Sequence, residues 1–179
     1  MGMTVIMNKQ ELRIYFKDLL IKTQEKITSG LVRHSLISKI SHLLKKLEIQ
    51  TVGLYYPLKY EINLLEITNL HPEIKFFLPK IIKNEIQYCP YHYKDSLALG
   101  NFKTFEPINN DLFIPELVII PGLAFSSDGY RLGYGKGHFD QYLNNNPNIL
   151  TAGVCLKEQL INNFPVESHD IKLKFVISV

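Results

Sequence analysis

Short apolar runs typical of β-strands alternate along this chain with amphipathic helical segments, and this alternation constrains the fold more than any other feature. Helical periodicity of about 3.6 residues begins at Lys9 and begins again after Ser29–Gly30. Five runs have strand character, and the first three each end at a proline: 51–56, 74–78, 117–120, 150–155 and 173–179. Strands that alternate with helices predict a mostly parallel sheet flanked by helices, which is a three-layer α/β fold.

The alternation is interrupted between residues 81 and 105. The run Ile86-Gln87-Tyr88 in this part is typical of a hairpin, so we expect an irregular or antiparallel insert there. A weaker helical stretch at 62–70 and a short helix at 138–143 complete the expected elements. Because no repeat, low-complexity tract or linker divides the chain, we expect a single domain over residues 1–179.

The composition narrows the classes of protein. The chain is 46% hydrophobic, which supplies one sizeable core and excludes intrinsic disorder. Its 20 basic and 17 acidic residues give a net charge of +3, too dilute to indicate a nucleic-acid partner. Cys89 and Cys155 are too few and too far apart for a disulfide scaffold. No segment has the pattern of a signal peptide or the roughly 18 apolar residues of a membrane helix. We therefore expect a cytoplasmic monomer with no membrane partner.

Glycines cluster in one short part of the chain. Five of the ten fall between residues 122 and 137: Gly122, Gly129, Gly133, Gly135 and Gly137. They follow the strand run 117–120 and precede a short helix, which is where ligands bind in an open α/β sheet. Glycines let backbone N–H groups approach a phosphate, and Arg131 and Lys136 add full positive charge. The segment therefore predicts a phosphate-binding loop.

The named phosphate motifs do not match this loop. Lys136 is followed by Gly137 rather than by Ser or Thr, and the glycine spacing differs from the dinucleotide-binding fingerprint. A flexible surface loop with incidental basic residues is the alternative interpretation. Tyr130, Tyr134 and Asp140 in the same stretch are unusual for a simple linker and favour a binding site.

The segments 118–125 and 129–140, the second reading GYRLGYGKGHFD, resemble the signature of the 5-formyltetrahydrofolate cyclo-ligase family, also called methenyltetrahydrofolate synthetases. Weaker landmarks of that family occur in order: Lys9-x-x-x-Arg13, Tyr56-Pro57 with Glu61, Leu78-Pro79-Lys80, Glu106-Pro107 and the segment 165–170. The resemblance runs from residue 9 to about residue 175.

The resemblance implies an ATP- and Mg²⁺-dependent ligase of one-carbon metabolism. Such an enzyme converts 5-formyltetrahydrofolate to 5,10-methenyltetrahydrofolate through a phosphorylated formyl group and releases ADP and phosphate. Phosphoryl transfer depends mainly on positioning and on neutralisation of charge, which explains why cations and glycines dominate the motif.

The resemblance also implies roles for individual residues. Arg131 and Lys136 are the expected catalytic residues. The expected ATP contacts are Lys9 and Arg13 together with the loop residues Arg131, Leu132, Gly133, Tyr134, Gly135, Lys136, Gly137, His138 and Phe139. Tyr56, Glu61 and Tyr134 are expected to bind folate, and Asp140 and Asp170 to hold Mg²⁺.

Alternatives remain open at this point. Lys9 and Arg13 could form a solvated helix face, and Glu61 and Asp140 could be acids that favour the start of a helix. The chain also departs from the usual family pattern at Ser126, at His138-Phe139 and at Lys174, where an acid is common. Because of these departures, the first alternative is that the chain is a family relative that binds nucleotide or folate but catalyses another reaction. A basic nucleic-acid-binding domain is the second alternative.

Overall fold

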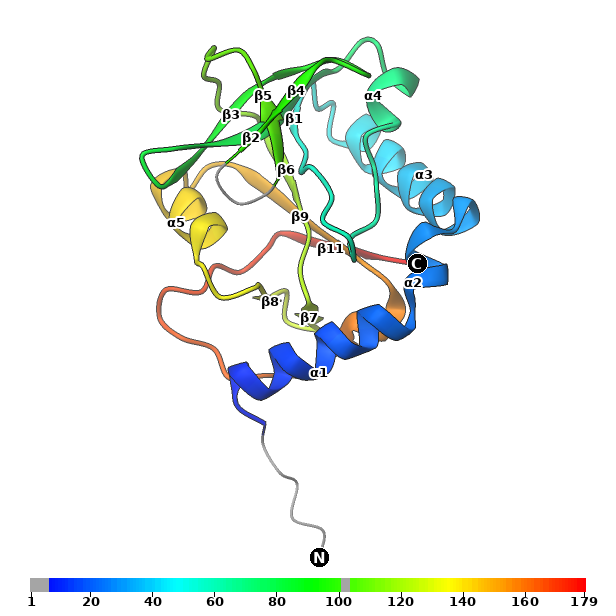
Figure 1. The fold of residues 1–179 in the computed structure, drawn as a ribbon, viewed down its shortest axis with the longest axis vertical. Coiled ribbons are helices and arrows are strands. Elements are labelled where there is room, and N and C mark those ends of the chain that lie inside the picture. Colours follow the sequence, from blue (N-terminus) through cyan, green and yellow to red (C-terminus); the bar gives the residue numbers. More distant parts are fainter. Residues whose placement is uncertain (1–6, 101–103) are drawn as a thin grey trace, which may run out of the picture.

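The computed structural model describes residues 7–100 and 104–179. Its main sheet has six strands in the order β11-β9-β6-β1-β2-β3 (Figure 1). Their bounds are Phe175–Ser178 (β11), Leu150–Cys155 (β9), Leu117–Ile120 (β6), Thr51–Gly53 (β1), Lys75–Ile82 (β2) and Glu85–Tyr91 (β3). The first five strands of this order are parallel to one another, and β3 pairs antiparallel with β2. The predicted mainly parallel α/β fold is thus confirmed.

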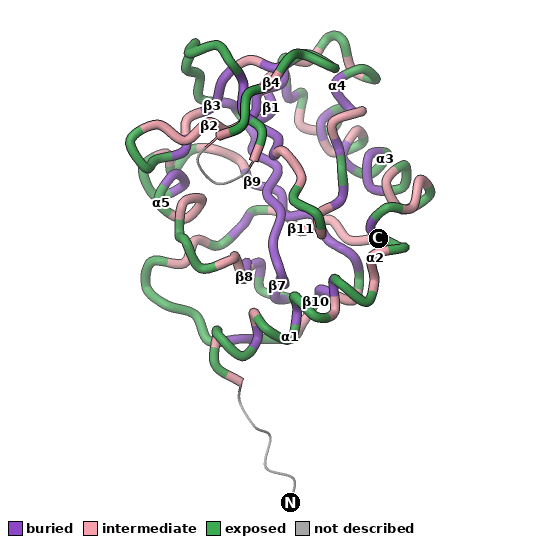
Figure 2. The backbone as a smooth tube through the Cα atoms, viewed as in Figure 1, coloured by how far each residue is buried: buried purple, intermediate pink, exposed green. Residues whose placement is uncertain are grey.

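Helices cover both faces of this sheet. The central strand β6 is completely buried; Leu117 and Ile119 pack into one apolar cluster and Val118 and Ile120 into another, as the pleat of a strand requires. Helix α3 (Gly30–Lys46) packs into the first cluster, and α5 (His138–Asn145) packs into the second. The buried residues follow the central strands between these helices (Figure 2). The sheet is therefore the middle of three layers.

The first helical segment is well specified by its sequence. Helix α1 (Lys9–Lys22) begins with a capping box, in which the side chains of Asn8 and Glu11 each bond to the other residue's backbone N–H. Its buried stripe consists of Leu12, Phe16 and Leu20, whereas Tyr15, which the periodicity also placed in the stripe, is exposed. A short helix, α2 (Gln24–Thr28), follows before Ser29 caps α3.

Three expected boundaries were wrong, and the first is that of β1, which covers only Thr51–Gly53 of the run expected at 51–56. Strand β2 runs through Pro79 to Ile82 instead of ending at the proline. Its pairing with β1 stops at Phe77, so the edge of β2 that faces β1 needs no backbone N–H at Pro79. The helical stretch expected at 62–70 is reduced to α4 (Ile67–Leu70). Asn63 accepts the N–H of Leu65 at 3.0 Å, a local turn that competes with helix formation.

The expected insert is antiparallel. Lys83 and Asn84 join β2 to β3 with φ angles of 51° and 65°, as a two-residue hairpin of type I′ requires. A two-stranded sheet follows, formed by β4 (Leu97–Leu99) and β5 (Phe105–Pro107). The glycine-rich segment is also more regular than a loop, since it contains β7 (Ala124–Ser126) and β8 (Arg131–Leu132). These two strands form a second small sheet with β10 (Leu160–Ile161), which follows the 3₁₀ turn Lys157–Gln159.

Two glycines set the path of the chain from β8 into α5. Gly135 and Gly137 have φ angles of 98° and 70°, in the left-handed region that favours glycine. Gly137 is the N-cap of α5, so the first N–H groups of this helix, which have no partner within it, follow directly on the glycine-rich segment. None of the described helices is long and apolar enough to cross a membrane.

Candidate active site

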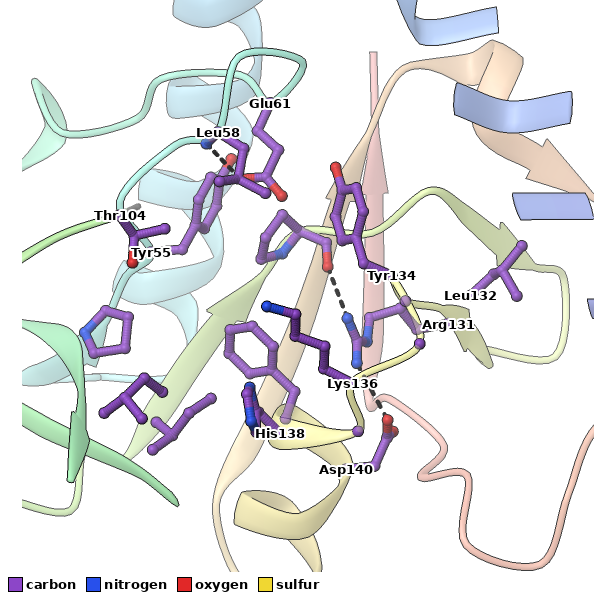
Figure 3. A pocket seen from close by; sticks show the side chains of 18 of the residues that line it. Tyr55, Leu58, Glu61, Thr104, Arg131, Leu132, Tyr134, Lys136, His138 and Asp140 are labelled. Atoms are coloured by element: carbon purple, nitrogen blue, oxygen red, sulfur yellow. Dashed lines mark hydrogen bonds and ion pairs between the residues drawn. The ribbon is translucent and has the colours of Figure 1, made fainter. Parts of the chain in front are cut away.

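A cavity of about 470 Å³ opens where β1 and β6 end. Its walls come from α1, the 55–61 loop, strands β2, β3 and β5, the segment from Arg131 to Asp140, and the 169–170 turn (Figure 3). Every residue assigned to the site from the sequence lines this one cavity: Lys9, Arg13, Tyr56, Glu61, the nine residues from Arg131 to Phe139, Asp140 and Asp170. The structure therefore brings these residues together, and their individual roles stay predictions.

Two parts of the cavity differ in chemistry. We call the first the phosphate arm; it consists of Lys9 and Arg13 on α1 and the segment from Arg131 to Phe139. We call the second the aromatic arm; it is lined by Tyr55, Tyr56, Leu58, Pro79, Ile81, Ile86 and Phe105. The Glu61 carboxyl group lies between the rings of Tyr55 and Tyr134 in Figure 3.

Arg131 is the buried cation of the phosphate arm, with only 6% of its side chain exposed. Its Nη1 donates to the carbonyl of Pro121 at 3.2 Å, and its Nη2 lies 3.3 Å from Oδ2 of Asp140. The guanidinium also lies 5.2 Å from the centre of the Phe139 ring. Burial lowers the pKa of Arg131, and the carboxylates of Asp140 and Glu61 oppose that effect, so the group stays charged at neutral pH.

Helix α1 contributes two cations at positions i and i+4. The Nε of Arg13 donates to the carbonyl of Gly133 at 3.1 Å, which ties the helix to the glycine segment. A side chain at Gly135 would place its Cβ 3.5 Å from the Arg13 guanidinium and would also adopt an unfavourable φ. The absence of side chains here keeps the backbone N–H groups of the phosphate arm accessible.

Lys9 is held by acids from the 167–170 turn. Its Nζ lies 2.5 Å from Oδ2 of Asp170 and 3.0 Å from Oε2 of Glu167. Partial burial works to raise the pKa of Asp170, but the N–H of Glu167 and the Lys9 ammonium outweigh it and keep the pKa below its usual value. Lys9 is thus positioned at the rim of the cavity by two carboxylates.

Glu61 is an unusual carboxyl group in the wall of the cavity. The N–H of Leu58 donates to its Oε2 at 2.8 Å. Burial raises the pKa of Glu61 to about 7, although the Leu58 N–H, the nearby Tyr134 hydroxyl and the charge of Arg131 all favour the carboxylate. The Tyr134 hydroxyl is buried and has no hydrogen-bond partner of good geometry among the described residues. Glu61 and Tyr134 together therefore offer polar atoms that a bound ligand could satisfy.

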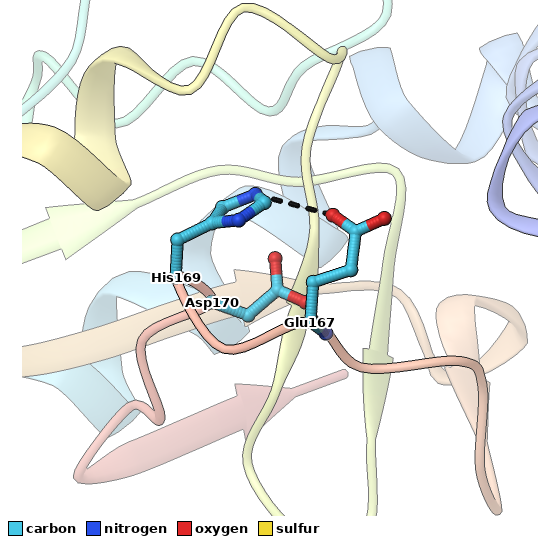
Figure 4. Close-up of side chains that lie close together, drawn as sticks. All are labelled: Glu167, His169 and Asp170. Carbon is cyan, nitrogen blue, oxygen red and sulfur yellow. Dashed lines mark hydrogen bonds and ion pairs between the residues drawn. The ribbon is translucent and has the colours of Figure 1, made fainter.

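The two acids expected to hold Mg²⁺ lie in separate ion pairs, Asp140 with Arg131 and Asp170 with Lys9. Asp170 also belongs to a cluster with Glu167 and His169, in which one ligand atom from each residue lies within 4.8 Å of the others (Figure 4). Carboxylate oxygens suit Mg²⁺, so the donor set at the rim fits this ion, which would compete with the cations now paired there.

The departures from the usual family pattern lie at different distances from the cavity. His138 and Phe139 line it. Ser126 is buried outside it, where its Oγ accepts the N–H of Tyr130 at 3.1 Å and closes the turn between β7 and β8. Lys174 is exposed and does not line the cavity.

The sequence did not identify most of the aromatic arm. Ile86 and Phe105 come from the insert, and nothing in their local pattern indicates that the insert folds back onto the end of the sheet. Glu106 stood out as part of a Glu-Pro landmark but had no assigned role; it is 7% exposed and lines the cavity. Lys17 also lines the cavity, and its position four residues after Arg13 on α1 could have identified it.

The fold and the cavity define an α/β protein with a glycine-rich segment that carries Arg131 and Lys136 at the carboxyl ends of a parallel sheet. A sequence model of the 5-formyltetrahydrofolate cyclo-ligase family matches residues 5–179. The chain therefore belongs to this family.

Individual relatives agree with this assignment. The chain is 30% identical over 148 residues to the 5-formyltetrahydrofolate cyclo-ligase of Mycoplasma pneumoniae, covering 78% of this chain and 79% of that protein. It is 31% identical over 122 residues to the probable enzyme of Schizosaccharomyces pombe, a match that spans 57% of this chain and 60% of that relative. The solution structure of Aquifex aeolicus 5,10-methenyltetrahydrofolate synthetase is similar to this chain, with a TM-score of 0.76 and 30% sequence identity. The match covers 96% of this chain and 90% of the Aquifex aeolicus chain.

Proposed function

We propose that the chain is a 5-formyltetrahydrofolate cyclo-ligase, which uses ATP and Mg²⁺ to form 5,10-methenyltetrahydrofolate, ADP and phosphate. The observation that carries the proposal is that one cavity joins a phosphate arm to an aromatic arm. A nucleoside triphosphate and a flat organic substrate can therefore meet in it, as the transfer of a phosphoryl group between them requires.

The reaction takes place in two steps. The formyl oxygen on N5 attacks the γ-phosphorus of ATP, the bond from that phosphorus to the bridging oxygen breaks, and ADP leaves. N10 then attacks the formyl carbon, the bond from that carbon to the phosphorylated oxygen breaks, and phosphate leaves. The proton on N10 is released, and the five-membered ring of the methenyl product is complete.

The phosphate arm supplies charge and position for the first step. Lys136 and Arg13 would neutralise the phosphates, and the N–H groups from Gly133 to the start of α5 would bind their oxygens. Arg131 is paired with Asp140 and the Pro121 carbonyl. It would therefore act through its positive charge and by holding the segment from Arg131 to Asp140 in place. Asp140 and Asp170 would hold Mg²⁺, which when bound neutralises the charge on the transferred group.

The other polar groups suit the folate. The pterin ring of folate carries an amino group and a ring N–H, and Glu61 presents a carboxyl group held by the Leu58 N–H. A carboxylate can accept both hydrogens in a bidentate arrangement. Tyr134 and Tyr56 would contact the same substrate from the two sides of the cavity.

An absorbance assay tests this proposal. The methenyl product absorbs in the near ultraviolet, and we expect its signal to rise from 5-formyltetrahydrofolate only when both ATP and Mg²⁺ are present. ATP consumption without the absorbing product would indicate a family relative with another reaction. Binding to nucleic acid that weakens steeply with salt, with no turnover, would instead favour the nucleic-acid alternative.

We also propose that the chain works as a cytoplasmic monomer. All residues of the cavity come from one chain, and Cys89 and Cys155 are both buried free thiols. Light scattering during size-exclusion chromatography should give a mass near 20.7 kDa with full activity in the monomer peak. Activity confined to a larger species would contradict this.

A further inference from the structure

Three side chains outside the cavity are joined by two hydrogen bonds in a row. The hydroxyl Oγ of Ser41, on α3, lies 2.7 Å from Nε2 of His71, and the other ring nitrogen of His71, Nδ1, lies 3.0 Å from Oε1 of Glu73. His71 is the C-cap of α4, which ends beside α3, and Glu73 follows it in the turn before β2 (Figure 1). None of the three residues lines the cavity, so a role for them is independent of the proposed function.

The carboxylate of Glu73 sets the direction of both hydrogen bonds. Its own backbone N–H and the His71 ring keep the pKa of Glu73 below its usual value, so the group is ionised at neutral pH and can only accept. Nδ1 of His71 therefore carries the hydrogen. In a neutral imidazole Nε2 then has a free lone pair, and it accepts the hydrogen of the Ser41 hydroxyl. Ser41 thus faces a base that a carboxylate holds in the correct tautomer.

The backbone around these groups is held by secondary structure, whereas the groups themselves are open to solvent. Ser41 lies inside the 17-residue helix α3. The His71 N–H donates to the Ile67 carbonyl at 3.2 Å, and the His71 carbonyl accepts the N–H of Ile74 at 3.1 Å. The side chain of His71 is 23% exposed, that of Glu73 is 67% exposed, and Ser41 is partly exposed. The arrangement is therefore fixed in position and accessible to small molecules.

We propose that Ser41 is a nucleophile toward small carboxylic esters with a good leaving group, that His71 is its general base, and that Glu73 positions His71. A hydroxyl within hydrogen-bond reach of a base, whose far side is held by a third group, is the arrangement that activates serine on unrelated folds. The two distances, 2.7 Å and 3.0 Å, meet this requirement.

The position of Ser41 inside a helix decides the class of ester. Backbone N–H groups in a helix interior are bonded to the carbonyls four residues before them, so they are not available to stabilise an oxyanion at Ser41. The substrate must therefore bring its own activation, as an aryl ester does, because its leaving oxygen is a weak base. General-base catalysis alone supplies about 100- to 10,000-fold in rate.

The reaction transfers the acyl group to Ser41 and then to water. Oγ of Ser41 attacks the carbonyl carbon while its proton passes to Nε2 of His71. The bond from that carbon to the leaving oxygen breaks, the leaving oxygen takes the proton from Nε2, and Ser41 carries the acyl group as an ester. A water molecule then attacks the same carbon and gives a proton to Nε2. The bond to Oγ breaks, Oγ takes that proton, and the carboxylic acid is released.

Incubation with 4-nitrophenyl acetate tests the proposal. Absorbance follows the release of 4-nitrophenolate, and mass spectrometry of the intact protein and of its peptides locates the acetyl group. Hydroxylamine removes a serine ester but leaves acetylated lysine intact, which separates the expected product from non-specific reaction. We expect a hydroxylamine-sensitive acetyl group on Ser41, and we expect Ser41→Ala to lose this product.

Substitutions of the other two residues test their separate roles. His71→Ala should lower the rate of Ser41 acylation by about 100-fold, and added imidazole should restore part of the rate. Glu73→Ala should lower it by about tenfold, because the imidazole then loses the group that fixes its tautomer and stabilises its charged form. Glu73→Asp should recover most of the rate, a rescue that a purely structural role would not give.

Two further substitutions are matched controls. Ser38→Ala removes an exposed serine from the same helix, and His92→Ala removes an exposed histidine that lies 3.2 Å from Asp95 between β3 and β4. Neither should change the acylation of Ser41. Circular dichroism and a thermal melt establish that each variant is folded, and His71→Gln, which keeps a polar side chain, carries the test if His71→Ala is unstable.

The possible results decide the matter clearly. Acetyl groups on lysines alone would overturn the proposal, and so would a Ser41 ester that forms as fast in the two His71 variants as in the natural protein. Acylation that needs His71 but is unaffected by Glu73→Ala would overturn the positioning role of Glu73. The cyclisation assay reports on a separate site, so none of these results bears on the proposed function.

Discussion

The two arms of the cavity are built in different ways. The phosphate arm is mostly one continuous stretch, Arg131 to Phe139, joined by two cations on α1. The aromatic arm is assembled from four separate parts of the chain: the 55–61 loop, β2, β3 and β5. A phosphate needs backbone N–H groups and charge, which a short glycine-rich stretch can supply. A flat organic ring needs area from several directions, which only tertiary packing supplies.

The comparison predicts that substitutions in the phosphate arm act mainly on turnover. We expect Lys136→Ala to lower kcat by about 100- to 1,000-fold, since it removes a full charge where negative charge develops in the transition state. Steady-state absorbance kinetics measure the effect. Lys45→Ala, which removes an exposed lysine on α3, is the control and should leave kcat unchanged. Turnover of Lys136→Ala close to that of the natural protein would remove Lys136 from the catalytic machinery.

The sequence located the phosphate arm because its signal is local: glycines, Arg131 and Lys136 lie within a few residues after a strand. It could not show that Arg131 is buried against Asp140, or that Lys9 is paired with Asp170 across 161 positions of sequence. Such pairings depend on which segments the fold places side by side. The fold was predicted well where the helical period was regular, as in α1, or where an apolar strand run was well bounded, as in β6 and β9. It was predicted poorly where the hydrogen bond of one side chain ends the expected helix, as at Asn63.

Glu61 lies between the two arms. Its burial should lower the free energy of unfolding of the ligand-free protein once the carboxyl group is ionised. Burial raises its folded-state pKa from 4.5 to about 7, so the unfolded chain loses this proton at lower pH than the folded chain. Stability should therefore fall as pH rises from about 4.5 to 7, by roughly 3 kcal/mol in all. Glu61→Gln cannot ionise and should escape this loss, so the variant should be more stable than the natural protein at pH 8 but not at pH 4.5.

Urea denaturation at pH 4.5 and pH 8 measures this difference. Glu25→Gln, which changes an exposed glutamate on α2, is the control and should leave the pH dependence of unfolding as it is. The same Glu61→Gln protein should bind 5-formyltetrahydrofolate more weakly at pH 8, where the natural residue is a carboxylate. A variant with unchanged stability and unchanged folate affinity would show that Glu61 is an ordinary surface acid. Glu61 would then not separate the phosphate arm from the aromatic arm.

The ion pair of Lys9 with Asp170 is expected to have a smaller effect. The side chains are 11% and 10% exposed, so each charge is mostly removed from water. A double-mutant cycle with Lys9→Met and Asp170→Asn should give a coupling of about 1–2 kcal/mol in the free energy of unfolding. The exposed pair of Lys22 with Asp18 on α1 is the matched control, for which about 0.3–0.5 kcal/mol is expected. Equal couplings in the two cycles would mean that the 167–170 turn is not held to α1 by this pair.

The smallest expected effect is at Glu106, which follows Phe105 in β5 and whose hydrogen bond to β2 does not require a charge. Its Oε1 accepts the Ile81 N–H, and a glutamine can do the same through its amide oxygen. Glu106→Gln should therefore bind 5-formyltetrahydrofolate as the natural protein does. Glu106→Ala leaves that N–H unpaired and frees β5, so we expect folate binding to weaken about threefold to fivefold while ATP binding is unchanged. Calorimetry with each ligand distinguishes the arms: a loss of ATP affinity in Glu106→Ala would show that the two arms are mechanically coupled, whereas a loss for folate alone would show that the insert serves only the ring-binding side of the cavity.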